Sequence, residues 1–154
     1  MSRRYDEVAR MPTTTREQMG EVHVRVRLSN AMDVEMAERG LLERDRVRTC
    51  EVDGLADSGA ARSVILVDVA NHLGLLIRHQ KIAQLADGRE VPVGVSGPML
   101  IEIYDREVFE EAFVLGNQML LGQTALESMD LLVDCASRKV IPNPAHPEGP
   151  VWRI

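Results

Sequence analysis

The chain has 154 residues, a formal net charge of -6 and 45% hydrophobic residues. This length suits a single domain that buries its core without disulfides or a structural metal. The acidic balance argues against a nucleic-acid partner, because proteins that bind the phosphate backbone gather Lys and Arg on one face. Aromatic residues make up only 3% of the sequence, so we expect a core of Val, Leu, Ile and Met.

The sequence contains no apolar stretch long enough to cross a membrane, and its first residues lack the apolar segment of a signal peptide. We therefore expect a cytoplasmic protein without a membrane partner. Cys50 and Cys135 are interpreted as small buried apolar residues, because two distant cysteines make no disulfide framework. The histidines lack ligand spacing and no Gly-rich phosphate loop follows a strand, so neither a metal nor a cofactor is predicted.

Three parts of the chain differ in composition. Residues 1–20 are polar, charged and rich in threonine without an apolar period, and predict a flexible N-terminal arm. Residues 21–142 carry the patterns of regular structure and are expected to form the domain. Residues 143–154 are a proline-rich C-terminal tail, which cannot be helical.

The domain begins with strand-like sequence. Apolar and polar residues alternate over Val22–Leu28, which is typical of a half-buried strand, and residues 29–30 predict a turn. A mixture of apolar and charged residues follows at Val34–Ala37. A second strand-like run extends over Arg46–Leu55.

The rest of the domain alternates short strands with turns. A short amphipathic helix is expected over Val67–Leu75, and a second one begins at Gly122 with Thr124 as a possible cap. Further strands are predicted at Lys81–Leu85, Arg89–Val95, Met99–Tyr104, Val108–Leu115, Leu131–Asp134 and Lys139–Ile141. This pattern indicates an all-β sandwich or barrel with one or two short helices.

A carboxylate stands at the end of the second strand. The sequence Asp57-Ser58-Gly59-Ala60 places a hydroxyl and a glycine directly after Asp57. The tripeptide Asp-Ser-Gly also suits a helix cap or an Asx turn, and a tripeptide of Asp, then Ser or Thr, then Gly arises by chance in roughly one chain in ten of this length. Alone it is a weak signal.

Two further motifs follow it along the chain. A predicted hairpin has at its tip Ala86, Asp87 and Gly88. An apolar pair and a glycine precede the second helix, namely Leu120, Leu121 and Gly122. In this order the motifs resemble the retropepsin family, the retroviral-type aspartic proteases. The resemblance covers roughly residues 21–142, and the segment from Ala56 to Ile65 is most similar to bacterial members of that clan, clan AA.

The resemblance implies an all-β, retropepsin-like acid-protease barrel that is active as a homodimer, with Asp57 as the catalytic residue. Ser58 would then hydrogen-bond across the twofold axis to the backbone of the partner subunit. Gly59 would leave room for the substrate main chain, and Ala60 would complete the same active-site loop.

Roles for the other two motifs follow from the same resemblance. The Leu-Leu-Gly sequence that ends at Gly122 would pack beneath and beside the Asp57 loop and shield it from water, although a plain core role fits it equally well. The hairpin tip around Asp87 would act as a flap over an extended peptide, and an ordinary turn is an equal alternative. Viral members commonly carry an acidic residue near the position of Ala61 that pairs with an arginine at the position of Gln123, and both partners are missing here.

The chemistry of peptide hydrolysis gives an independent reason for a dimer. Cleaving an amide needs a base that deprotonates water and an acid that protonates the substrate. Two carboxylates about 3 Å apart share one proton and supply both groups. Since this chain has a single Asp-Ser-Gly, the second carboxylate must come from another copy, with a twofold axis between the two Asp57 side chains.

Three hypotheses follow. The first is an aspartic endopeptidase that acts on peptide or protein substrates, and the complete Asp-Ser-Gly sequence favours it. The second is a catalytically silent module of the same fold that serves dimerisation or peptide binding, with Asp57 retained for loop structure. The third is an unrelated β-barrel binder with a chance motif, for which we expect a monomer.

Overall fold

The computed structural model describes residues 20–154. The predicted N-terminal arm, apart from Gly20, lies outside the described residues. No helix in the described part of the chain is both long and apolar enough to span a membrane.

The described residues form mainly short strands. In chain order these are β1 His23–Asn30, β2 Thr49–Ala56, β3 Val64–Ile65, β4 Ile77–Gln84, β5 Glu90–Ser96, β6 Met99–Ile103, β7 Arg106–Glu110, β8 Phe113–Val114, β9 Met119–Leu121, β10 Leu131–Asp134 and β11 Lys139–Pro142. The helices are α2 Ala31–Glu38, α3 Val67–His72 and α4 Gln123–Ser128, with a 3-10 helix, η1, at Arg44–Arg46.

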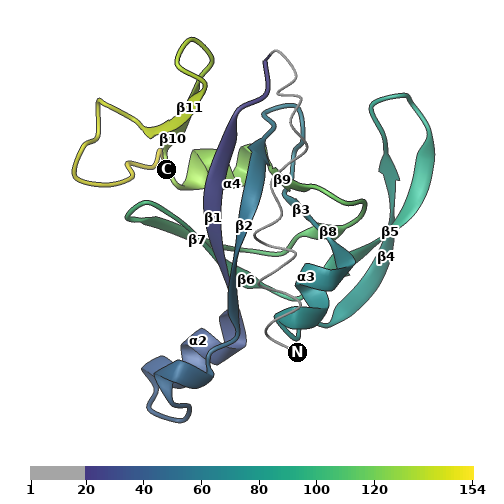
Figure 1. Ribbon diagram of the computed structural model, residues 1–154, viewed down its shortest axis with the longest axis vertical. Coiled ribbons are helices and arrows are strands. Elements are labelled where there is room, and N and C mark those ends of the chain that lie inside the picture. The colour runs from purple at the N-terminus through teal and green to yellow at the C-terminus, as the bar shows by residue number, and fades with distance from the viewer. Residues whose placement is uncertain (1–19) are drawn as a thin grey trace.

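Nine strands form one sheet in the order β4-β5-β8-β3-β9-β2-β1-β6-β7, while β10 and β11 form a separate hairpin. The large sheet curls into a half-barrel, and the β4–β5 hairpin and the β10–β11 hairpin stand on either side of the upper end of β2 (Figure 1). β2 ends at Ala56, directly before Asp57.

The core is aliphatic, as the composition predicts. Buried and outward-facing residues alternate along β1, so that Val24, Val26 and Leu28 face inward. No aromatic residue is among the buried hydrophobic residues of the described range. Cys50 is buried as expected, but the interpretation was wrong for Cys135, which is exposed in the turn between β10 and β11.

The segment after β1 differs from the prediction. Asn30 does not form a simple turn with Ser29; it ends β1 and caps α2, because its side-chain oxygen accepts a hydrogen bond from the N–H of Asp33 at 3.0 Å. The amide nitrogen of the same Asn30 side chain donates to the carbonyl of Leu73 at 2.8 Å. One residue therefore starts α2 and ties it to the end of α3.

Two other predicted elements are shorter than expected. The strand predicted from Arg46 begins only at Thr49, because Arg46 is the last residue of η1 and residues 47–48 connect η1 to the strand. The strand predicted over Val108–Leu115 is broken at residues 111–112, where the N–H of Ala112 donates to the hydroxyl of Ser96 at 3.1 Å. Its two halves, β7 and β8, consequently pair with different neighbours.

The proline-rich tail contains no helix, and it is hydrogen-bonded to the body of the protein. Arg106 is 3% exposed, and its guanidinium donates to the carbonyl oxygens of Met129 at 3.1 Å, Asp130 at 2.7 Å and His146. Asn143 adds a bond from its side-chain amide to the carboxylate of Asp130 at 3.0 Å. This buried arginine therefore joins the start of β7 to the residue after α4 and to the tail.

An ion pair fastens α2 to the start of β2. The side chain of Asp33 is 9% exposed and accepts three bonds from Arg48, one from its backbone N–H at 3.0 Å and two from its guanidinium at 2.8 and 3.0 Å. The side-chain hydrogen bond from Arg48 is the main cause that holds the pKa of Asp33 below its ordinary value, against the opposing effect of burial.

We expect Asp33→Asn to lower the free energy of unfolding at pH 7 by about 1–3 kcal/mol, because charge-assisted bonds to Arg48 are lost. A carboxyl group with a lowered folded-state pKa stabilises the fold above its unfolded-state pKa, and loses that contribution as the pH falls through the folded-state value. The variant should therefore depend less on pH than wild type in the acid range. Urea titrations at pH 7 and at successively lower pH measure both effects.

Glu35→Gln is the matched control on the same helix. Glu35 forms an exposed pair with Arg39, so its loss should cost less than about 1 kcal/mol. Equal effects of the two substitutions would contradict a special role for Asp33.

Candidate active site

The Asp57 loop begins directly at the end of β2. The N–H of Asp57 donates to the carbonyl of Leu121 at 3.0 Å, and the carbonyl of Asp57 accepts from the N–H of Ala60 at 3.1 Å. The N–H of Gly59 donates to Oδ1 of Asp57 at 3.0 Å. The backbone thus forms a tight turn that orients the carboxylate, which is half-buried, whereas Ser58 and Gly59 are exposed.

The loop is held by β9, which lies between β2 and β3 in the sheet. β9 runs parallel to β2, with Ala56 opposite Leu121, and antiparallel to β3, with Val64 opposite Leu120. The chain must therefore pass over β9 between Asp57 and β3. Leu121 is fully buried and Leu120 half-buried, and both belong to β9, which pairs with the strand that leads into the Asp57 loop.

The start of α4 is capped by the same loop. The N–H of Gln123 donates to the carbonyl of Ala60 at 2.8 Å, and the N–H of Thr124 donates to that of Ala61 at 3.1 Å. The first N–H groups of a helix have no partner within the helix, so these bonds replace a side-chain cap. Thr124 is consequently not the cap: Gly122 occupies that position, and the Thr124 hydroxyl donates to Glu110.

Gly122 makes the closest approach in the site. A Cβ at this position would lie 2.3 Å from the carbonyl carbon of Arg62 and 2.6 Å from the nitrogen of Ser63. The N–H of Gly122 donates to the hydroxyl of Ser63, which is fully buried, at 3.1 Å. Sequence reasoning missed Ser63, although a serine directly ahead of an apolar run was the one available signal.

Backbone hydrogen bonds also join the two segments that contain Ala61 and Gln123, the positions at which viral members carry an ion pair that is missing here. Ala61 is exposed and bonds through its carbonyl to α4, while the side chain of Gln123 donates to Glu127 within α4 at 2.7 Å. The loop and α4 are therefore connected without that ion pair.

The predicted flap residues form the tip of the β4–β5 hairpin. The N–H of Gly88 donates to the carbonyl of Leu85 at 2.9 Å, and Gly88 has a φ of 86°, which glycine adopts without strain. Asp87 accepts from the N–H of Arg89 at 3.0 Å and from its guanidinium at 2.7 Å. These bonds, the backbone one first, lower the pKa of Asp87. The residues at the tip, Ala86, Asp87 and Gly88, are exposed, and the hairpin projects from the body of the molecule (Figure 1).

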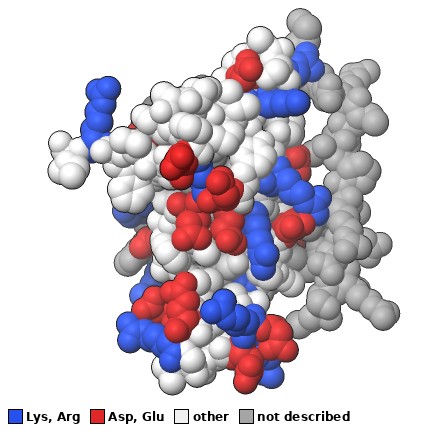
Figure 2. Space-filling view, turned by 90° about the vertical axis from the view of Figure 1, so that its left-hand side faces the viewer, with Lys and Arg blue, Asp and Glu red and all other residues white. Residues whose placement is uncertain are grey.

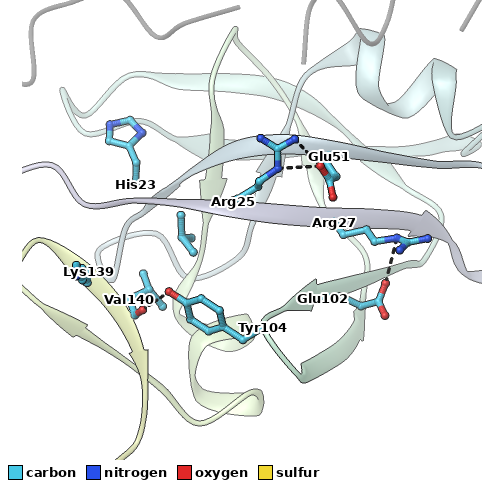
Figure 3. Close-up of a pocket in the computed structure, with 9 residues that line it drawn as sticks. His23, Arg25, Arg27, Glu51, Glu102, Tyr104, Lys139 and Val140 are labelled. Atoms are coloured by element: carbon cyan, nitrogen blue, oxygen red, sulfur yellow. Dashed lines mark hydrogen bonds and ion pairs between the residues drawn. The ribbon is translucent and has the colours of Figure 1, made fainter. Parts of the chain in front are cut away.

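A groove of about 700 Å³ lies on the outer face of β1. None of the predicted site residues lines it. Both of its arginines are paired: Arg25 bonds to Glu51, and Arg27 lies 3.7 Å from Glu102 (Figure 3). On the face drawn in Figure 2, Lys and Arg are interspersed with Asp and Glu and form no basic patch. Among residues 20–154, no group of three or more His, Cys, Asp or Glu side chains could hold a metal ion.

His23 lines the same groove, and its side chain lies between two carboxylates. Its Nδ1 lies 2.7 Å from Asp53 and its Nε2 lies 3.0 Å from Glu21. Burial lowers the pKa of His23, but the bonds to Glu21 and Asp53 outweigh it and raise the pKa overall. This cluster links β1 to β2 and gives no sign of a bound ligand.

We expect Gly122→Ala to destabilise the protein by about 1–3 kcal/mol, because the added methyl group meets rigid backbone rather than a flexible side chain. The φ of −82° at Gly122 suits alanine, so the cost is purely steric. Thermal unfolding measures it. Gly97→Ala is the control, since a Cβ there meets nothing closer than 3.8 Å, and a similar loss in both variants would contradict the argument.

Neither a protein-family model nor a curated protein matches the chain. Among solved structures, the retroviral protease-like domain of Ddi1 from Leishmania major matches with 13% sequence identity and a TM-score of 0.53, over 88% of this chain and 97% of that chain. EIAV protease complexed with an inhibitor matches with 18% identity and a TM-score of 0.42, over 75% of this chain and 92% of that chain. The chain has the retropepsin-like fold that its sequence predicts, a mostly β structure with a few short helices.

Proposed function

We propose that the protein is an aspartic endopeptidase of the retropepsin type, in which Asp57 and the partner's Asp57 form a catalytic dyad in a homodimer. The observation that carries the proposal is the construction of the Asp57 loop. A half-buried carboxylate stands at the end of β2, its own backbone is bonded to Leu121, and its loop is bonded to α4. These bonds restrict the movement of the carboxylate, and catalysis requires that a reacting group be held in a fixed position.

The proposed reaction uses one proton shared between two carboxylates. Two carboxylates about 3 Å apart cannot both be ionised, so one is a base and the other an acid. The base removes a proton from water as the water oxygen attacks the peptide carbonyl carbon, and the acid protonates the carbonyl oxygen. The intermediate then collapses with proton transfer to the nitrogen, which breaks the C–N bond and releases two peptides.

The substrate in this proposal is an extended peptide that binds between the Asp57 loop and the β4–β5 hairpin. An edge strand offers unpaired backbone groups to such a peptide, and β4 is at the edge of the large sheet. The tip around Gly88 would close over it. We also propose, from the sequence of the segment from Ala56 to Ile65, that the chain is a bacterial member of clan AA.

The decisive test is cleavage of a peptide library, read by mass spectrometry over a range of pH. We expect Asp57→Asn to reduce the turnover by at least about 100-fold, because an amide can neither accept nor share the proton. The fold should be unchanged, since Asn keeps the oxygen that accepts from Gly59.

Asp45→Asn is the control for removing one negative charge. Asp45 is exposed in η1 and lies outside the proposed machinery. If wild type and Asp57→Asn cleave alike, or if a folded wild-type dimer yields no products, the chain is a silent module rather than a protease.

A mixing experiment tests whether the two carboxylates come from different subunits. Excess Asp57→Asn protein, equilibrated with wild type, should lower the wild-type activity in proportion to the mixed dimers formed, because each mixed dimer has one carboxylate. The Asp45→Asn protein should not inhibit at the same excess. Activity that is unaffected by Asp57→Asn would show that one chain is sufficient.

A further inference from the structure

Glu110 is a half-buried residue at the end of β7, and its two carboxylate oxygens accept from two different hydroxyl groups. Oε1 accepts from the hydroxyl of Thr124, the second residue of α4. Oε2 accepts a longer bond, at 3.5 Å, from the hydroxyl of Ser63, which directly precedes β3. One carboxylate therefore bridges two segments that are distant in the sequence, the start of β3 and the start of α4.

Ser63 connects this carboxylate to Gly122. The hydroxyl oxygen of Ser63 is buried and accepts from the N–H of Gly122 at 3.1 Å. A hydroxyl group has a single proton and can rotate, so an acceptor is needed to fix the direction in which it points. Because Glu110 takes this proton, the lone pairs of Ser63 stay directed at the N–H of Gly122.

Gly122 lies between the two residues that hold the Asp57 loop. The carbonyl of the preceding residue, Leu121, accepts from the N–H of Asp57 at 3.0 Å. The N–H of the following residue, Gln123, donates to the carbonyl of Ala60 at 2.8 Å. A displacement of Gly122 therefore reaches both ends of the loop, which makes the loop sensitive to the bonds that hold Gly122.

A groove of about 490 Å³ lies beside Glu110. The other charged residues that line it are Arg62, Lys81 and Glu111, so the groove carries two charges of each sign. Glu110 is consequently not an isolated charge in the core, and its own two oxygens are occupied by hydroxyl groups. The part that Glu110 plays thus lies in these two bonds and not in an ion pair with a single partner.

We propose that Glu110 is a positioning residue for the Asp57 loop. It orients the hydroxyls of Ser63 and Thr124, and through them it holds Gly122 in place. The inference deepens the proposed function and rests on it, because an effect on turnover requires that Asp57 reacts. Glu110 takes no part in the proton transfer. It supplies a fixed direction for the reacting carboxylate, and a misplacement of about 1 Å can cost about 100-fold in rate.

Glu110→Gln tests the proposal with little change in shape. The amide keeps one accepting oxygen but presents an NH₂ donor in place of the other, so one of the two hydroxyls loses its acceptor. We expect the kcat for peptide cleavage to fall at least about fivefold while KM stays nearly unchanged. This separation of kcat from KM is the signature of a group that positions the reacting residue rather than the substrate.

Thr124→Val tests the same link from its other end, because it removes the hydroxyl and keeps the shape of the side chain. It should lower kcat in the same way. The double variant should lose clearly less than the product of the two single losses, since both substitutions break one shared contact. Two effects that simply multiply would contradict the proposed link.

Glu111→Gln is the matched control for the lost charge. Glu111 is the next residue, is exposed, lines the same groove and takes no part in the bonds described above. Its substitution should leave kcat within about twofold of wild type, as is usual for a surface position. Circular dichroism and sedimentation velocity compare the fold and the dimer of all variants.

Amide hydrogen exchange, read by mass spectrometry, measures the loop without any need for activity. In peptides that cover residues 57–63 and 121–124, we expect exchange to become at least about threefold faster in Glu110→Gln and in Thr124→Val, because local opening becomes easier. Glu111→Gln should exchange like wild type. If Glu110→Gln does not fold, Thr124→Val decides the question, because it changes an exposed residue and removes the same link.

The outcomes separate this inference from the proposed function. Exchange in the loop that is the same in Glu110→Gln as in Glu111→Gln would overturn the inference whatever the activity. If exchange becomes faster but wild type shows no Asp57-dependent cleavage, the support of the loop by Glu110 stands and the protease fails. If cleavage depends on Asp57 but Glu110→Gln keeps the kcat of Glu111→Gln, the protease stands and the inference fails. A raised KM with unchanged kcat would assign Glu110 to substrate binding and would also overturn the inference.

Discussion

The close approach of Gly122 to the backbone of Arg62 and Ser63 is the constraint on which the rest of the site depends. There is no room for a side chain between the two segments. Their contact allows β9 to lie between β2 and β3 and allows the first N–H groups of α4 to bond to the Asp57 loop. The loop and the helix therefore satisfy each other's backbone groups, and neither is complete alone.

This arrangement fixes one carboxylate firmly but supplies only one. The single chain holds Asp57 half-buried at the end of β2, and the next residue, Ser58, is exposed. In the proposed dimer, the second carboxylate comes from the partner's Asp57.

Local patterns predicted the features that depend on neighbouring residues. The alternation in β1, the Asp57 turn and the hairpin tip at Gly88 all follow from short sequence motifs, whereas the place of Leu121 beside the loop was expected only from the family resemblance. Helix α2 was not predicted because it buries only Ala31 and Asp33 and so shows no apolar stripe.

Contacts between distant residues could not be predicted in this way. Gly122 and Ser63 are separated by 59 positions, and Arg106 and His146 by 40. Nothing in the composition of the tail indicates that a buried arginine binds it. The predicted strand over Val108–Leu115 is also interrupted between β7 and β8, where the N–H of Ala112 donates to the hydroxyl of Ser96, although its sequence has the pattern of one continuous strand.

The bond between Asp57 and Leu121 has a consequence during synthesis. The chain leaves the ribosome from its N-terminus, and the Asp57 loop cannot be held until β9 and the start of α4 have followed. Parallel pairing of distant strands such as β2 and β9 forms slowly, because the intervening chain must first be closed into a loop. A nascent chain that still lacks β9 therefore cannot hold its own Asp57 loop. In the proposed protease, cleavage would have to wait until β9 and the start of α4 have been translated.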